Sequence, residues 1–265
     1  MTTPATMYEE WFVPAVFAPL ARETLARTDL APNARILDVA CGSGIVARLA
    51  ARRIGPSGSV AGLDLNPAML AMARAAAEAE GLAIDWREGS ADDLPFADGA
   101  FDTVFCQMGL QFFPDRPRAV SEMRRVLAPG GQAAASTWRD LSFHPLFAAW
   151  SETVERVSGS TAMGLPFSFG DPPQLQALFA DAGFGDVRAE PVTIEADLGE
   201  PERYVERQIV ASGAAISALR EMRDEERTAA IDALSEVLAP VIAEHVDNGR
   251  VRVTMTGTIV RAFTR

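Results

Sequence analysis

Short apolar runs alternate with helical stretches along the middle of this 265-residue chain, and this alternation limits its possible folds more than any other feature. Parallel strands need crossover connections, which are usually helices, and the right-handed crossover rule leaves a doubly wound sheet as the simplest topology. The pattern therefore predicts an α/β fold with a mostly parallel seven-stranded sheet. The expected strands cover residues 35–40, 59–64, 82–87, 101–107, 132–137, 186–194 and 250–263.

Helical spacing predicts the elements between and around these strands. The expected helices cover residues 45–54, 67–80, 116–127 and 172–182, with further helical stretches at 7–28 and 201–246. We expect a single domain, 1–265, because the chain shows no repeat, low-complexity tract or linker. Its expected parts are an N-terminal helical cover (1–30), a core (35–138) and two lid insertions (139–170 and 198–247).

Charge and composition exclude several kinds of function. The formal net charge is −12, and such a field disfavours a polynucleotide substrate. All 24 basic residues are arginine, which excludes a Schiff-base lysine, a P-loop lysine and a Tyr-Lys dehydrogenase pair. Cys41 and Cys106 lie in apolar segments and are expected to be buried free thiols. With two histidines and no Cys/His cluster, we expect no metal site.

The N-terminus lacks a basic region followed by an apolar core, and no apolar run reaches membrane-spanning length. We therefore expect a cytoplasmic protein without a membrane partner. It should act as a monomer or homodimer on a small molecule.

The first expected strand runs directly into Asp38-Val39-Ala40-Cys41-Gly42-Ser43-Gly44. Glycines let the backbone turn tightly and approach a ligand at the start of the next helix. Asp64 ends the second strand, where a carboxylate can accept hydrogen bonds from a ribose diol. Together these features predict a site for a nucleoside cofactor at the strand ends.

The glycine turn alone does not decide which cofactor is bound. Residues 42–47 also satisfy the G-x-G-x-x-A pattern of dinucleotide sites. Asp38 would repel a pyrophosphate but would suit the ammonium group and positive sulfur of S-adenosylmethionine. The alternative is that Asp38 caps the turn and faces away from any ligand.

Four segments resemble, in order, the motifs of class I S-adenosylmethionine-dependent methyltransferases, particularly the ubiquinone/menaquinone-biosynthesis (methyltransferase type 11) branch. They are residues 36–44, 61–70, 89–96 with 101–104, and 125–131. The resemblance covers about two-fifths of the chain and implies a Rossmann-like methyltransferase fold. It makes 35–138 the cofactor-binding core of a single methyltransferase domain.

The resemblance also implies which residues contact S-adenosylmethionine, with S-adenosylhomocysteine as the product. The first motif would hold the methionine part, Asp64 the ribose and the third motif the adenine. The implied cofactor-binding residues are Tyr8, Asp38, Ala40, Gly42, Ser43, Gly44, Asp64, Leu65, Met69, Ser90, Ala91, Asp92 and Gln107.

Some of these residues depart from the family pattern or have a second interpretation. Ser90 stands where the family often has Asp, so Asp92 is expected to read the adenine amino group instead. Ala40 replaces a frequent Gly. Tyr8 would either close over the methionyl carboxylate or pack with Trp11 and Phe12.

Substrate-binding candidates follow the fourth and fifth strands. Met108 and Gln111 should flank the cleft where the strand order reverses. Gln111-Phe112 stands where the family frequently has a histidine pair, which makes this side less polar. His144 is a candidate general base or substrate partner, and the alternative is a polar residue that ties the lid to the sheet. His245 is expected to be an ordinary surface residue.

The sequence therefore predicts methyl transfer to O, C or N of a small apolar metabolite by in-line displacement, driven mainly by positioning. One alternative is a protein that binds S-adenosylmethionine without transferring the methyl group, in a cyclase-like or interaction role. The other is an NAD-dependent oxidoreductase.

Overall fold

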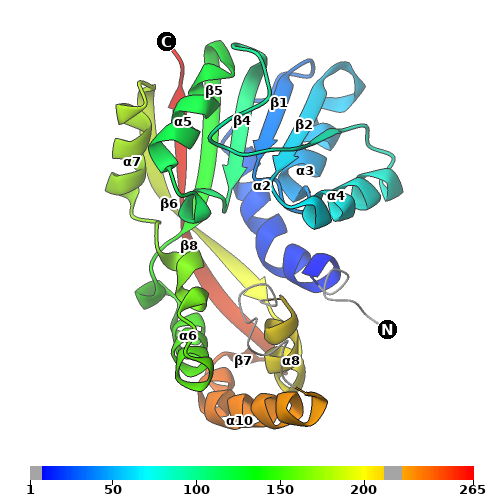
Figure 1. Ribbon diagram of the computed structural model, residues 1–265, viewed down its shortest axis with the longest axis vertical. Helices are drawn as coiled ribbons and strands as arrows, with labels where there is room; N and C mark the ends of the chain where they lie inside the picture. The colour runs from blue at the N-terminus through cyan, green and yellow to red at the C-terminus, as the bar shows by residue number, and fades with distance from the viewer. Residues whose placement is uncertain (1–7, 212–222) are drawn as a thin grey trace. The chain divides into compact units, whose positions relative to one another are not determined.

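The computed structural model describes residues 8–211 and 223–265 (Figure 1). Residues 1–7 of the expected N-terminal cover and 212–222 of the second expected insertion lie outside the described residues. The backbone forms two compact units. Of the described residues, the core unit comprises 20–139, 169–192 and 257–265, and the helical unit comprises 8–19, 140–168, 193–211 and 223–256.

The central sheet has the predicted doubly wound order. Its strands follow one another as β3 (Asp85–Glu88), β2 (Ser59–Asp64), β1 (Arg35–Val39), β4 (Phe101–Gln107), β5 (Leu127–Trp138), β8 (Arg250–Phe263) and β6 (Gly185–Asp197). The first five strands pair in parallel, and β8 runs antiparallel to β5. The prediction of a mostly parallel sheet is confirmed. A short strand that the pattern does not predict, β7 (Val246–Asp247), pairs with β8.

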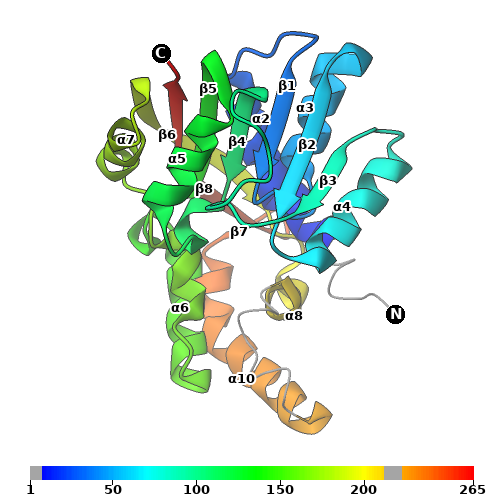
Figure 2. The same cartoon turned by 45° about the horizontal axis from the view of Figure 1, so that its top comes forward.

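Helices cover both faces of the sheet in the core unit (Figure 2). Helices α2 (Ala18–Ala26) and α3 (Ile45–Ile54) pack on one face, and α5 (Arg116–Arg125) and α7 (Pro172–Asp181) pack on the other. Helix α4 (Pro67–Ala79) begins after Asn66, whose side chain accepts a hydrogen bond from the Ala68 N–H at 2.9 Å. Pro67 suits this first position because its missing N–H would be unbonded there.

The third strand begins later than the sequence predicts, at Asp85 rather than at residue 82. Gly81 adopts a left-handed φ of 67°, and the Leu82 N–H donates to the Ala77 carbonyl at 2.9 Å. Leu82 therefore terminates α4 instead of pairing in the sheet.

The helical unit contains η1 (Tyr8–Phe17), η4 (Leu141–Phe143), α6 (Pro145–Ser158), η5 (Ala162–Phe167), α8 (Pro201–Ala211) and α10 (Asp224–Ala243). Its core includes Trp150 and Tyr204, whose ring centroids lie 6.5 Å apart. The Trp150 indole N–H donates to the Met163 sulfur at 3.3 Å. The unit holds residues 8–19 of the expected cover and most of the described residues of both expected insertions, whereas residues 20–30 of the expected cover belong to the core unit. The function of these segments as a lid stays a prediction.

Candidate functional site

The glycine turn connects β1 to α3 in the core unit. Gly44 precedes α3 with a φ of 81°, and a Cβ at this position would lie 2.4 Å from the Trp86 ring, so only glycine fits. Gly42 also has a left-handed φ, of 56°, but a Cβ there would meet nothing within 4 Å. The Gly42 backbone therefore borders open space, as a turn that approaches a ligand requires. Ser43 is buried between the two glycines.

Asp64 fixes this turn to the end of β2. Its Oδ2 accepts a hydrogen bond from the Gly42 N–H at 2.7 Å, and its Oδ1 accepts one from the Asn66 N–H at 2.9 Å. A carboxylate has about four acceptor positions, so each oxygen keeps capacity for a further donor. The structure thus joins Asp64 to the turn, and its contact with a ribose stays a prediction.

Asp38 is fully inside the core unit, with 1% of its surface exposed. Its Oδ2 accepts a hydrogen bond from the Ala47 N–H at 3.0 Å, whereas its Oδ1 has no hydrogen-bond partner among the described residues. Burial raises the pKa of this carboxyl group to about 8, and the nearby charge of Asp64 adds to the rise. Asp38 therefore does cap α3, but it also carries one unbonded oxygen.

Two residues that directly follow strands of the core unit are held in a left-handed conformation. Ala40 follows β1 with a φ of 55°, and Met108 follows β4 with a φ of 57°. Such φ values are costly for residues other than glycine and concentrate at functional sites. A Cβ on Gly109 would lie 2.9 Å from the Ala40 Cβ, so the two loops approach closely. They meet where the strand order reverses, which is the ligand-binding edge of such sheets.

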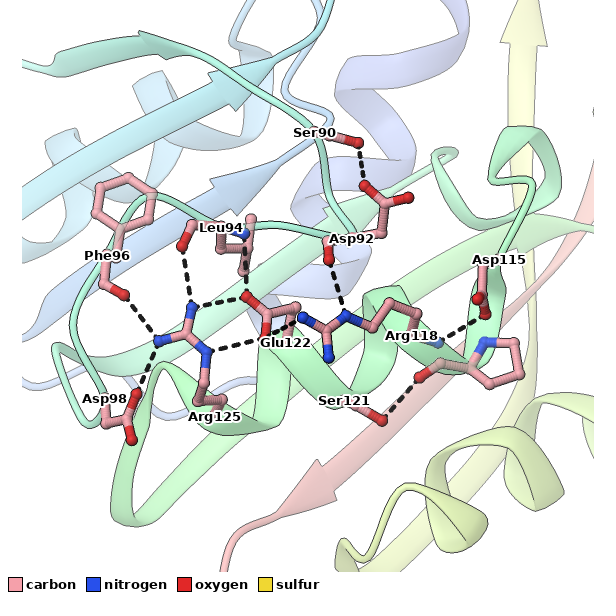
Figure 3. A network of polar contacts seen from close by, with 11 residues as sticks. Ser90, Asp92, Leu94, Phe96, Asp98, Asp115, Arg118, Ser121, Glu122 and Arg125 are labelled. Carbon is pink, nitrogen blue, oxygen red and sulfur yellow. Dashed lines mark hydrogen bonds and ion pairs between the residues drawn. The ribbon is translucent and has the colours of Figure 1, made fainter.

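The expected adenine-binding residues lie at the ends of β2 and β3. Ser90 donates a hydrogen bond to one carboxylate oxygen of Asp92, which fixes the acid expected to read the adenine amino group (Figure 3). Leu65 is 70% exposed although it is apolar, and Met69 in α4 is half-buried. Ala91 is buried. Leu65 directly follows Asp64, the expected ribose acceptor, and its exposed side chain offers an apolar surface on which an adenine ring could stack.

Gln107, Met108 and Gln111 lie at or after the carboxyl end of β4. Gln111 belongs to η3 (Leu110–Phe112) and is 1% exposed, yet neither atom of its amide has a hydrogen-bond partner among the described residues. The next residue, Phe112, is 51% exposed. This edge therefore combines an unbonded amide with an apolar ring.

Tyr8 and both histidines belong to the helical unit. The ring of Tyr8 lies 6.1 Å from that of Phe12, one of its two expected packing partners, and 5.7 Å from that of Phe17, which is not among them. Its contact with a cofactor stays a prediction.

His144 has both ring nitrogens engaged by the backbone. Its Nδ1 lies 3.1 Å from the Asp140 carbonyl, and its Nε2 accepts a hydrogen bond from the Thr256 N–H at 3.1 Å. The ring is therefore neutral, with the proton on Nδ1, and burial lowers its pKa. In this arrangement no ring nitrogen is available to take a substrate proton, which favours the structural interpretation of His144.

His245 donates from Nδ1 to the Val241 carbonyl at 2.8 Å, and both histidines line a cavity of about 390 Å³ in the helical unit. Both cysteines are buried free thiols, as predicted. Within residues 8–211 and 223–265, no cluster of His, Cys, Asp and Glu could hold a metal ion. Among the same residues, no helix is long and apolar enough to cross a bilayer.

Comparisons with known proteins identify the family. Residues 36–131 match the family model described as a methyltransferase domain. The chain is 31% identical over 242 residues to an uncharacterized protein of Mycobacterium bovis, covering 87% of this chain and 86% of the relative. It is 38% identical over 177 residues to the demethylmenaquinone methyltransferase of Thermus thermophilus, covering 60% of this chain and 77% of that enzyme.

Solved structures share the fold at low sequence identity. The YcgJ protein of Bacillus subtilis has a TM-score of 0.61 at 18% identity, over 92% of this chain and 97% of that one. The [4+2]-cyclase SpnF has a TM-score of 0.55 at 22% identity, over 93% and 80% of the two chains.

Some matches are shorter. The chain spans about half the length of several curated relatives: 53% of another M. bovis protein, and 45% of the 2-phytyl-1,4-naphtoquinone methyltransferase of Synechococcus elongatus. The family model, over residues 36–131, covers the glycine turn, the acid that ends β2 and the loop before β4. The chain belongs to the class I S-adenosylmethionine-dependent methyltransferases of the ubiquinone/menaquinone type.

Proposed function

We propose that this protein transfers the methyl group of S-adenosylmethionine to an oxygen, carbon or nitrogen atom of a small apolar metabolite. The proposal includes one soluble cytoplasmic domain, a monomer or homodimer, and no nucleic-acid partner. The observation that carries it is the meeting of the glycine turn, Asp64 and the loop after β4 at the point where the strand order reverses.

The residues at this edge fit the cofactor. The unbonded Oδ1 of Asp38 offers an acceptor to the ammonium group, which would lower the raised pKa of that carboxyl. Open space beside Gly42 admits the methionyl chain, and the exposed side chain of Leu65 offers an apolar surface to the adenine. Asp64 would hold the ribose, and Asp92 the adenine amino group. When bound, S-adenosylmethionine supplies a methyl group on a positively charged sulfur.

The acceptor side of the site supports an apolar substrate with one polar group. Phe112 provides an exposed ring, and the Gln111 amide provides a donor and an acceptor that the described residues do not use. This chain's residues would therefore act mainly by holding the acceptor in line and by excluding water. We do not assign a general base, because both nitrogens of His144 are engaged.

The first test is calorimetric titration of the purified protein with S-adenosylmethionine, S-adenosylhomocysteine and NAD(H). Binding of the first two and not of NAD(H) is the expected result. Binding of NAD(H) alone would favour the oxidoreductase alternative and overturn the proposal.

The second test measures transfer. With labelled methyl donor, we expect incorporation into members of a panel of apolar phenols, quinols and amines. Tight cofactor binding with no transfer to any acceptor in a cell extract would favour the alternative of a protein that binds S-adenosylmethionine without methylation.

A further inference from the structure

The loop before β4 has no secondary structure of its own. Residues 89–100 contain no helix or strand, and within them the Phe96 N–H donates to the Leu94 carbonyl at 2.8 Å. The shape of such a loop depends on hydrogen bonds from neighbouring elements, because its backbone groups have few partners within the segment. This loop carries Ser90, Ala91 and Asp92, the residues expected at the adenine.

Arg125, at the end of α5, bonds to the loop at three places (Figure 3). Its Nη2 donates to the Leu94 carbonyl at 2.9 Å, and its Nη1 donates to the Phe96 carbonyl at 2.8 Å. Its Nη1 also lies 2.8 Å from the Asp98 carboxylate. A planar guanidinium can hold several acceptors in fixed directions, which a lysine cannot do.

Glu122 lies one turn before Arg125 on α5 and bonds both to the loop and to Arg125. It is 4% exposed and accepts a hydrogen bond from the Leu94 N–H at 3.0 Å. Its two oxygens also accept from Arg125, at 2.9 and 2.6 Å, and this pairing holds the pKa of Glu122 below its usual range. Arg118 donates to the Asp92 carbonyl at 3.0 Å and lies 3.6 Å from Glu122.

We propose that Arg118, Glu122 and Arg125 are positioning residues for the cofactor, which fix the loop so that Ser90 and Asp92 face the adenine. This inference rests on the proposed function, because it names how the adenine end of that same site is built. The three side chains contact the loop and not the cofactor. Arg118 acts on Asp92 directly, by a hydrogen bond to its carbonyl, and Glu122 and Arg125 fix the residues that follow Asp92 in the loop.

The burial of Glu122 argues that the network does more than stabilise the fold. Glu122 lies on the buried face of α5 with Ala119, Met123 and Val126, where an apolar side chain would be expected. A buried ion pair often stabilises a protein less than apolar packing of the same volume does. Here each bond of the network that leaves α5 ends on the same loop, so the network selects one loop conformation.

The test compares Arg125→Met and Arg118→Met with a matched control, Arg124→Met. Arg124 is the neighbour of Arg125 on α5, but its Nε donates to the Gly183 carbonyl at 3.0 Å, outside the loop. The first readout is amide hydrogen exchange of residues 90–98 in the ligand-free protein. The second is the affinity for S-adenosylhomocysteine and for 5′-methylthioadenosine, which contains the adenosine part without the amino acid.

We expect Arg125→Met to speed exchange of the Leu94 amide by about tenfold or more. The acceptor of that amide is Glu122, which loses the partner that orders its carboxylate. The affinity of the Arg125→Met variant should fall about tenfold for each ligand, and the two losses should be equal because both ligands contain adenine. Arg118→Met should give a smaller loss of the same kind, and Arg124→Met should change neither readout.

Unchanged exchange in the loop, or faster exchange with unchanged affinity for both ligands, would overturn the inference. If Arg125→Met does not fold, Arg118→Met decides, because the Arg118 side chain is 57% exposed and its removal is tolerable. Failure of the unsubstituted protein to bind either ligand would instead overturn the proposed function, and this inference with it.

Discussion

Two buried polar side chains, one in each unit, differ in how their hydrogen-bonding groups are satisfied. Gln111 in the core unit is 1% exposed, and neither atom of its amide is bonded among the described residues. His144 in the helical unit is 2% exposed, and both its nitrogens are bonded to the backbone. A buried polar group is costly unless it has a partner. Gln111 is therefore the better candidate for a ligand contact, and His144 for a structural role.

The same contrast extends to the surroundings of the two residues. The carboxyl edge of the core sheet also holds the unbonded Oδ1 of Asp38, and the hydroxyl of Thr137 at the end of β5 is unbonded too. Such groups gather where the sheet topology places ligands. In the helical unit, the ring of His144 lies 4.9 Å from that of Phe167 between centroids, and both its nitrogens are hydrogen-bonded to backbone groups. The predictions below test this difference.

Loss of Asp64 should have the largest effect. Asp64→Ala removes the expected ribose acceptor and also frees the Gly42 N–H. We expect S-adenosylhomocysteine binding to weaken by about 100-fold or more, which is about 2.7 kcal/mol or more. Calorimetric titration measures this.

The matched control is Asp102→Ala. Asp102 also accepts a backbone N–H, that of Arg35 at 2.9 Å, but at the opposite end of β1. Its loss should leave binding unchanged. Near-native affinity in Asp64→Ala would exclude the ribose contact.

Asp38→Asn should weaken binding by about tenfold and remove its pH dependence. With a pKa of about 8, Asp38 is mostly protonated at pH 7 in the free protein. A bound ammonium group would favour the ionised form and release a proton, so affinity should rise between pH 6 and pH 8. Titration at pH 7 in buffers of different ionisation enthalpy detects the released proton. Identical enthalpies in all buffers would mean that Asp38 only caps α3.

Asp38 should also affect stability. Its folded pKa lies above its unfolded value, so the folded state binds the extra proton, and stability should decrease as the pH rises towards 8. Asp38→Asn keeps an acceptor for the Ala47 N–H and should not show this decrease. A thermal unfolding series from pH 5 to pH 9 checks it.

The sequence predicted the framework of the core unit because glycine and proline mark its element ends. Residues 45–54, 59–64 and 101–107 form the expected elements with the expected bounds. The left-handed φ of Ala40 could not be predicted, because the residue type gives no sign of it. The one indication was the family resemblance, because Ala40 stands where the family often has glycine, the residue that adopts a left-handed φ without strain.

Hydrogen bonds between residues that are distant along the chain could not be predicted from the sequence. Whether Gln111 and His144 are bonded depends on backbone groups such as Thr256 N–H, 112 residues from His144. The α5 network was also missed, although one signal was present. Glu122 falls on the apolar face of α5, three residues after Ala119 and four before Val126. A charged residue is rarely buried without a partner, so this position predicts buried hydrogen-bond partners.

Gln111→Leu and Gln132→Leu should have opposite effects on stability. Both glutamines are buried in the core unit, but the Gln132 amide donates to the Asp29 carbonyl at 2.5 Å and to Thr103 Oγ1 at 3.4 Å. Gln132→Leu should lower the free energy of unfolding by about 1–3 kcal/mol, because it removes both bonds and takes this partner from the buried Thr103 hydroxyl. Gln111→Leu should leave it unchanged or raise it slightly. Urea unfolding measures both, and a comparable loss in Gln111→Leu would show that its amide is satisfied within the protein.

The smallest effect concerns the pH dependence contributed by His144. Burial lowers its folded pKa below the unfolded value near 6.5, so the unfolded chain takes up the proton first as the pH falls. The stabilising contribution of neutral His144 is complete above the unfolded pKa and is lost as the pH falls from there through the folded pKa. His144 therefore lowers the unfolding temperature as the pH falls from 7.5 to 5.5, whereas Asp38 raises it over the same range, so a comparison of two proteins isolates the contribution of His144. His144→Phe keeps the ring packing on Phe167 but cannot titrate, so its unfolding temperature minus that of the unsubstituted protein should increase as the pH falls from 7.5 to 5.5. The same pH dependence in both proteins would mean that folding does not shift the pKa of His144, and the contrast with Gln111 would then fail.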